Sequence, residues 1–293
     1  YACAQAVAQA EAGAELLDVN AGLPDIDEPA TLEMLVRELQ SITDLPLQLD
    51  SSNKDALARA LRIYNGKPIV NSVNGEQKVL DSILPLCKKY GAAVVGLALD
   101  EHGIPKTAEG RFEVAKRIVA ATDAIGIPRG DVYIDCLTLT VSAQQDQAEE
   151  TLAAVRTVHR DMGLQTVLGV SNISFGLPNR LLMTQTFLIR ALNEGLTLPI
   201  INPNQKEIMD AVAACSTART RRARRMSSAL ARKPRLPLKS SAPPLFRLPR
   251  PRKQLPPSPT SMMRLFAASR QTRRAWRRKR WRPKTNCRWL KST

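Results

Sequence analysis

The stretch TVLGVSNISFGLPNR (residues 166–180) begins as an apolar run and stops abruptly at Ser171-Asn172. The run Thr166–Val170 is short and partly β-branched, which is typical of a buried strand. The next residues are rich in Ser, Asn, Gly and Pro, which favours a loop. A helical pattern follows at Arg180–Asn193, so the stretch predicts a strand, a loop and a helix in that order.

The same unit recurs along residues 1–215. The other runs predicted as strands are Leu16–Val19, Pro46–Leu49, Pro68–Val70, Ala93–Leu99, Val132–Ile134 and Leu198–Ile201. The other predicted helices are Thr31–Leu39, Lys54–Tyr64, Glu76–Tyr90, Phe112–Ala124 and Gln147–Met162. Regular alternation of strand and helix predicts parallel strands with right-handed crossovers.

Two α/β architectures fit this alternation, a doubly wound sheet and a (β/α)8 TIM barrel. No GxGxxG or GxxxxGK[ST] motif follows a predicted strand, which disfavours the nucleotide-binding doubly wound folds. The chain also opens inside an Ala-rich helical pattern. We therefore predict an eight-stranded barrel whose first strand is missing and whose last helix is interrupted near Cys215.

Charge divides the chain into two parts. Residues 216–293 hold 25 of the 43 Lys and Arg residues and no Asp or Glu, so residues 1–215 carry a net charge of −9. We predict a barrel domain at 1–215 and no domain at 216–293. The basic part, which contains all three Trp residues, is interpreted as a frameshifted or disordered tail. If made, such a tail binds nucleic acid only nonspecifically.

Cysteine content and hydropathy restrict the compartment. The five cysteines are scattered without a CxxC pair, so no zinc, iron–sulfur or disulfide framework is predicted. No apolar run approaches the roughly 18 residues that a membrane span needs. The first residue is Tyr1, and no signal peptide follows. The expectation is a cytoplasmic fragment of a longer protein, without a bound metal.

Every predicted strand is followed by Asp or Asn. The residues are Asn20, Asp50, Asn71, Asp100, Asp135, Asn172 and Asn202. Each one alone is explained by capping or turn preference, but seven of seven exceeds that expectation. In a parallel barrel these strand ends meet at one mouth, where active sites lie. Mixed Asp and Asn side chains suit a neutral heterocycle rich in N–H and C=O groups, and they do not suit phosphate.

Several stretches resemble the pterin-binding methyltransferases. That family includes the folate domain of cobalamin-dependent methionine synthase and the methyltetrahydrofolate:corrinoid/iron–sulfur protein methyltransferases. The resemblance covers about residues 1–214 and rests on GAELLDVNAGLPDIDEP (13–29), LPLQLDSSN (45–53), KPIVNSVNGE (67–76), VVGLALDEHGIP (94–105), VYIDCLTLTVS (132–142), LGVSNISFGLPNR (168–180) and LPIINPN (198–204).

The resemblance implies a reaction and a role for each strand-end residue. It implies transfer of the N5 methyl group of methyltetrahydrofolate, or a related methyltetrahydropterin, to a Co(I) corrinoid on a partner domain or protein; a homodimer is also compatible. Asp50, Asn71 and Asp135 would bind the pterin ring, and Asn172 would act at N5. Ser171 would orient Asn172. The rim residues would be Asn20, Asp100 and Asn202.

Two alternatives remain open. Dihydropteroate synthase shares the barrel, but it typically carries cationic motifs where this chain reads Ser171–Ser174 and Asn202–Asn204. The other alternative is an inactive fragment with a basic, nonspecific nucleic-acid-binding tail, because an incomplete barrel leaves unpaired strand edges.

Overall fold

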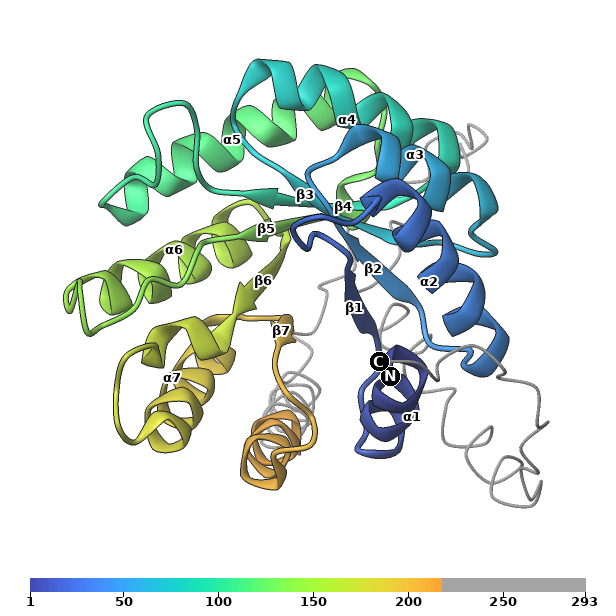
Figure 1. Ribbon diagram of the computed structural model, residues 1–293. Coiled ribbons are helices and arrows are strands. Elements are labelled where there is room, and N and C mark those ends of the chain that lie inside the picture. Colours follow the sequence, from blue (N-terminus) through green and yellow to red (C-terminus); the bar gives the residue numbers. More distant parts are fainter. Residues whose placement is uncertain (218–293) are drawn as a thin grey trace, which may run out of the picture. The chain divides into compact units, whose positions relative to one another are not determined.

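The computed structural model describes residues 1–217, and it shows one sheet of seven parallel strands curled into a nearly closed barrel (Figure 1). The strands pair in strict sequence order: β1 (Leu17–Asn20), β2 (Leu47–Asp50), β3 (Ile69–Val73), β4 (Ala93–Leu97), β5 (Val132–Asp135), β6 (Gln165–Gly169) and β7 (Leu198–Ile200). The predicted barrel is therefore confirmed.

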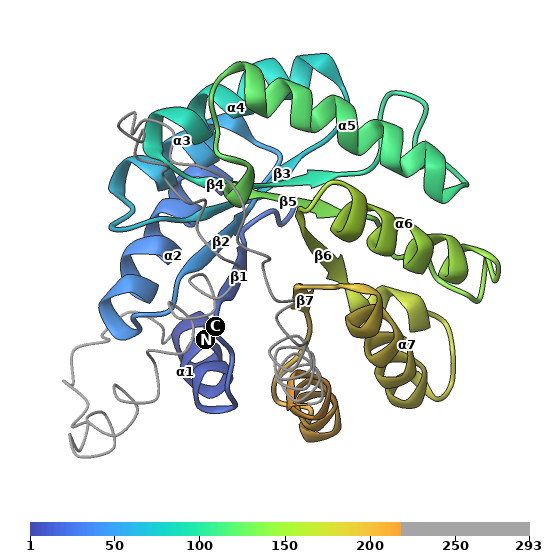
Figure 2. The ribbon, with the colours of Figure 1, turned by 180° about the vertical axis from the view of Figure 1, so that it is seen from behind.

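The helices lie outside the sheet (Figures 1 and 2). They are α1 (Ala2–Glu11), α2 (Glu28–Ile42), α3 (Lys54–Ile63), α4 (Gln77–Tyr90), α5 (Ala108–Ala124), α6 (Gln147–Asp161) and α7 (Arg180–Glu194), with short 3-10 helices η1 (Arg129–Asp131) and η2 (Val170–Ser174). The largest boundary errors are at the start of α5 and at both ends of α2. The first turns of these two helices carry little hydrophobic periodicity.

Helix ends follow local sequence chemistry. The Asp27 carboxylate accepts a hydrogen bond from the Ala30 N–H at 3.0 Å, and Thr107 caps α5 in the same way. At the other ends of α4 and α7, Gly91 and Gly195 adopt φ values of 65° and 117°, which favour glycine. These signals fix where each helix begins and ends.

Side-chain alternation along the strands creates two cores. Leu17, Val19, Leu47 and Leu49 belong to the large core between the sheet and the helices. A smaller core inside the barrel contains Ile69, Ala93, Val95 and Val167. Residues that alternate with the first set therefore point into the barrel, among them the polar ends of several strands.

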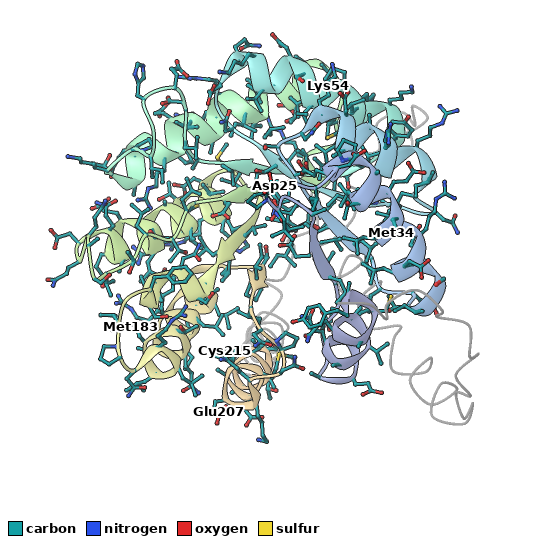
Figure 3. The ribbon with its side chains drawn as sticks, in the orientation of Figure 1. Asp25, Met34, Lys54, Met183, Glu207 and Cys215 are labelled. Carbon is teal, nitrogen blue, oxygen red and sulfur yellow. The ribbon has the colours of Figure 1, made fainter. Side chains whose placement is uncertain are left out.

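The outer surfaces of the helices face solvent. Met34 on α2 and Met183 on α7 are exposed and lie away from the centre of the barrel (Figure 3). None of the helices described within residues 1–217 is both long and apolar enough to cross a membrane.

The barrel has an opening between its two end strands. Among the described residues, β1 pairs only with β2, and β7 pairs only with β6. A helix at 206–217 follows β7, and Ile208 and Ala211 on it are buried. This helix is described through Cys215 to residue 217, and the chain in which the interruption predicted near Cys215 would continue lies outside the described residues. The basic tail predicted at 216–293 lies, from residue 218 onward, outside the described residues.

Candidate functional site

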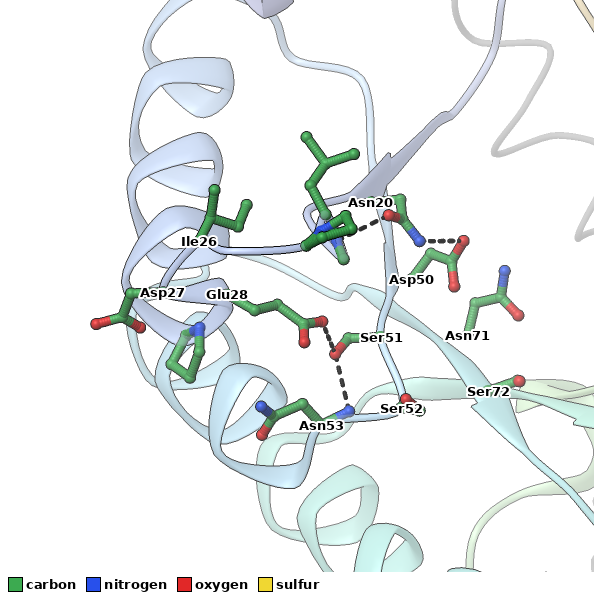
Figure 4. A pocket seen from close by; sticks show the side chains of 14 residues that line it. Asn20, Ile26, Asp27, Glu28, Asp50, Ser51, Ser52, Asn53, Asn71 and Ser72 are labelled. Atoms are coloured by element: carbon green, nitrogen blue, oxygen red, sulfur yellow. Dashed lines mark hydrogen bonds between the residues drawn. The ribbon is translucent and has the colours of Figure 1, made fainter.

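Three predicted site residues lie side by side on neighbouring strands. Asn20 pairs in register with Asp50, and Asp50 pairs in register with Asn71. The Asn20 amide Nδ2 donates a hydrogen bond to Asp50 Oδ2 at 3.0 Å (Figure 4). The register of the parallel sheet therefore places these three side chains in one row at the barrel mouth.

This row borders a cleft of about 660 Å³. The walls come from the loop after β1, the start of α2, the end of β2 and the end of β3. The lining residues are Asn20, Gly22, Leu23, Pro24, Ile26, Asp27, Glu28, Pro29, Asp50, Ser51, Ser52, Asn53, Asn71 and Ser72 (Figure 4). This lining contains no Lys or Arg, so it offers neutral and anionic acceptors to a ligand.

The residues beside Asp50 leave its carboxylate available to the cleft. Asn53 is the N-cap of α3, and its side chain accepts from the Asp55 and Ala56 N–H groups. Ser51 donates through its hydroxyl to Glu28 and accepts from the Asn53 N–H at 3.0 Å. Because Asn53 performs the capping, helix capping does not account for Asp50.

Two inward-facing residues of the cluster are absent from the sequence prediction. Gln48 Nε2 donates to Asp18 Oδ1 at 2.8 Å. This pair lies on the same two strands as the Asn20–Asp50 pair, two residues earlier on each. Gln48 is fully buried, and its Oε1 has no hydrogen-bond partner among the described residues. The available signal was strand alternation, because Asp18 and Gln48 each precede a predicted site residue by two positions.

The pKa values of both carboxyl groups in this cluster, Asp18 and Asp50, are raised. Desolvation, with a smaller contribution from the negative charge of Asp50, raises the pKa of Asp18 to about 6. Hydrogen bonds from Gln48 and Asn71 oppose the rise. Desolvation also raises the pKa of Asp50, while the Asn20 hydrogen bond lowers it and Glu28 raises it further. Donors brought by a ligand would stabilise these carboxylates in their ionised form.

Asp135 occupies the end of β5, on the other side of the mouth. Its Oδ1 accepts from the Leu137 N–H at 2.7 Å, and Leu137 adopts a left-handed conformation at φ 63°. Burial raises the pKa of Asp135 to about 7, against the Leu137 hydrogen bond and the positive charge of Arg111. The carboxyl group therefore changes protonation near neutral pH.

Asn172 lies in η2, directly after β6. A methyl group at Gly169 would stand 3.0 Å from Asn172 Nδ2, so the amide folds back over the glycine. The Asn172 side chain forms no hydrogen bond within residues 1–217, and both Ser171 and Asn172 are exposed. Ser171 contributes its carbonyl oxygen to Ser174 and Arg180, and its hydroxyl does not bond to Asn172.

Asp100 and Asn202 lie outside the cleft lining and serve local turns. Asp100 Oδ1 accepts from the His102 N–H at 3.0 Å, and Oδ2 stands 3.5 Å from Arg117. Asn202 Oδ1 accepts from the Asn204 N–H at 3.0 Å. The structure thus brings Asn20, Asp50 and Asn71 into one cleft and gives Asp100 and Asn202 turn-forming bonds.

Sequence comparisons place the chain among known proteins. The family model described as "Pterin binding enzyme" matches residues 1–202. The chain is 33% identical over 210 residues to a methionine synthase from Mycobacterium leprae, covering 67% of this chain and 17% of that protein. It is 30% identical over 215 residues to a methylcorrinoid:tetrahydrofolate methyltransferase from Eubacterium limosum, covering 72% of this chain and 79% of that protein.

Solved structures share the fold. A dihydropteroate synthase from Yersinia pestis aligns with a TM-score of 0.60 at 16% identity, covering 74% of this chain and 88% of that chain. A dihydropteroate synthase from Xanthomonas albilineans aligns with a TM-score of 0.58 at 20% identity, covering 74% of this chain and 84% of that chain. The barrel, the cleft at its mouth and the family match agree, and the chain belongs to the pterin-binding enzyme family.

Proposed function

We propose that this chain binds 5-methyltetrahydrofolate, or a related methyltetrahydropterin, and presents its N5 methyl group to a Co(I) corrinoid. The observation that carries the proposal is the in-register row of Asn20, Asp50 and Asn71 beside a cleft without cations. Two relatives support the choice of reaction, one named methionine synthase and one named methylcorrinoid:tetrahydrofolate methyltransferase.

The proposed binding mode follows from hydrogen-bond chemistry. A pterin ring carries an amide N–H and an exocyclic amine side by side, and a carboxylate accepts both. Asp50 and Asp135 supply such acceptors, and the Asn71 amide can donate to a ring carbonyl or accept from a ring N–H. The neutral ring needs no cationic partner, in agreement with the lining of the cleft.

Asn172 is proposed to act at N5. The Co(I) corrinoid, held by a partner domain or protein, supplies the electron pair that forms the new bond to the methyl carbon. The bond between N5 and that carbon breaks, its electron pair stays on N5, and N5 takes a proton from water. An amide near N5 stabilises the departing nitrogen by hydrogen bonding and needs no acidity of its own.

Dihydropteroate synthase is not favoured by the residues at the mouth. The resemblance to its solved structures lies at 16–20% identity and shows the fold alone. Neutral residues occupy the Ser171–Ser174 and Asn202–Asn204 loops. Of the nearby cations, Arg180 stacks over the Phe175 ring at 4.6 Å and bonds the Ser171 carbonyl, and Lys206 pairs with Asp210.

The decisive experiment measures methyl transfer from 5-methyltetrahydrofolate to free cob(I)alamin, with binding of the folate measured in parallel by calorimetry. Asn172→Ala should slow transfer about 100-fold, the cost of losing one donor to a developing charge, and change the dissociation constant much less. An unchanged transfer rate would refute the role of Asn172. The absence of folate binding by a monomeric protein with a sharp thermal transition would refute the proposed substrate.

A further inference from the structure

The most unusual buried group in the described structure is Arg111, in the first turn of α5. Its side chain is completely buried, and within residues 1–217 it forms no ion pair. An unpaired buried guanidinium is costly, so its hydrogen bonds must replace most of its hydration.

Those hydrogen bonds converge on the chain that follows Asp135. Arg111 Nη1 donates to the carbonyl oxygens of Cys136 at 3.0 Å and Leu137 at 3.3 Å. It also donates to Thr151 Oγ1 at 2.7 Å. Thr151 Oγ1 in turn shares its one proton between the Gln147 carbonyl at 2.8 Å and the Leu137 carbonyl at 3.0 Å.

The remaining donors fasten the guanidinium to two other elements. Nε donates to the Pro105 carbonyl at 3.0 Å, and Nη2 donates to Gln147 Oε1 at 2.7 Å. The loop before α5, the start of α6 and the end of β5 are thus joined through one side chain. This arrangement limits the rotation of the two peptides whose carbonyls Arg111 binds, Cys136–Leu137 and Leu137–Thr138.

The Cys136–Leu137 peptide is the one that contacts Asp135. Its carbonyl, that of Cys136, accepts from Arg111 Nη1 at 3.0 Å, while its N–H, that of Leu137, donates to Asp135 Oδ1 at 2.7 Å. The Leu137 carbonyl, in the next peptide, also accepts from Arg111 Nη1 at 3.3 Å. Leu137 adopts φ 63°, which a leucine rarely adopts without support from its surroundings. Arg111 therefore stabilises a strained turn. In this turn the Leu137 N–H points at the carboxylate of Asp135, a proposed ligand-binding residue.

We propose that Arg111 is a positioning residue for Asp135: by binding the Cys136 carbonyl it fixes the Cys136–Leu137 peptide, whose N–H orients the Asp135 carboxylate toward the pterin. The identity of the ligand rests on the proposed function, whereas the effect of Arg111 on Asp135 rests on geometry alone. The charged or titratable groups near this assembly are Cys136 beside Asp135 and Glu150 of α6 beside Arg111.

The first arm of the test needs no ligand. The full chain with 13C-labelled aspartate is titrated by NMR, and the Asp135 resonance is assigned with Asp135→Asn. In Arg111→Met the apparent pKa of Asp135 should rise by about one unit, because the positive charge and the ordered N–H donor are both lost. An unchanged titration in a folded Arg111→Met protein would overturn the proposal.

The second arm measures binding of 5-methyltetrahydrofolate between pH 5.5 and 8.5. Arg111→Met should move the pH midpoint of binding upward by the same amount and weaken binding about fivefold at pH 7, because a rise of one unit from a pKa of about 7 lowers the ionised fraction from about one half to about one tenth. Uniformly weaker binding with an unmoved midpoint would show a merely structural role. Lys116→Gln, an exposed change on the same helix, is the matched control.

A second variant tests the proposal if Arg111→Met does not fold. Thr151→Val keeps the side-chain volume and removes the hydroxyl shared by Arg111 and the Leu137 carbonyl. It should shift the Asp135 titration in the same direction by a smaller amount, and an unmoved titration would contradict the proposal. If the wild type does not bind 5-methyltetrahydrofolate, the proposed function fails while the NMR arm still decides the role of Arg111.

Discussion

The two sides of the barrel mouth position their polar residues by different means. On the β1–β3 side, Asn20, Asp50 and Asn71 share a strand register, and side chains bond directly to one another. On the β5–β6 side, Asp135 and Asn172 depend on backbone turns, on Leu137 in one case and on Gly169 in the other. The first side is fixed by the sheet, and the second is fixed by the elements that pack behind it.

The largest effect should come from breaking the register side. Asp50→Ala removes a charged acceptor and leaves the Asn20 amide without its partner. A hydrogen bond to a charged group contributes about 1.5–3 kcal/mol, so binding of 5-methyltetrahydrofolate should weaken by roughly 10- to 100-fold. Calorimetry measures it, with the exposed change Asp44→Ala as control; equal affinity in both variants would remove Asp50 from the site.

A smaller and more selective effect should come from Gly169→Ala on the other side. The φ of this glycine is −72°, so alanine is compatible with the backbone, and only the contact with Asn172 Nδ2 at 3.0 Å is affected. Displacing the amide should slow methyl transfer about tenfold, since small misplacements of reacting groups are costly. Binding should change little. Equal losses in binding and transfer would show that the contact does not act through Asn172.

The protonation of Asp135 should make stability and binding respond oppositely to pH. Its pKa of about 7 lies above the unfolded value, so the folded protein holds a proton that the unfolded chain releases. Stability should therefore fall as pH rises from about 4 to about 7, while pterin binding should strengthen up to and through pH 7. Asp135→Asn should be more stable than wild type at pH 8 by roughly 1–2 kcal/mol.

Thermal and urea unfolding across this pH range measure the stability difference, and the same samples serve for binding. Asp55→Asn is the control, because this exposed residue lies in the first turn of α3 and outside the cleft lining. A wild-type stability that rises between pH 5 and 7 relative to Asp135→Asn would contradict the assignment of the raised pKa to Asp135.

The smallest effects are expected at the two strand-end residues that form turns. Asp100 and Asn202 bond their own loops and do not line the cleft. Asp100→Asn and Asn202→Ala should each change pterin affinity less than about twofold, within the usual range for surface changes. A tenfold loss in either variant would restore that residue to the binding site.

Strands β1 and β5 show which features the sequence predicts and which it misses. Short apolar runs predicted both strands, and Asn20 and Asp135 are the last residues of the observed strands. Asp18 was not predicted because the predicted site contained only residues at strand ends, and Asp18 faces into the barrel from within β1. Arg111 was not predicted because its role depends on carbonyl oxygens 25 and 26 residues away. Its position directly before the predicted helix Phe112–Ala124 is typical of an ordinary polar surface site.

Residue order alone determined the β/α alternation, because hydrophobic periodicity and helix caps act over a few residues. It also placed an Asp or Asn at or near the end of each strand. Only the tertiary structure decided which of these residues share a cleft, because strand register and loop folding join segments that are distant in sequence. The raised pKa values of Asp18 and Asp135 were decided in the same way, since desolvation and neighbouring charges exist only after the chain has folded.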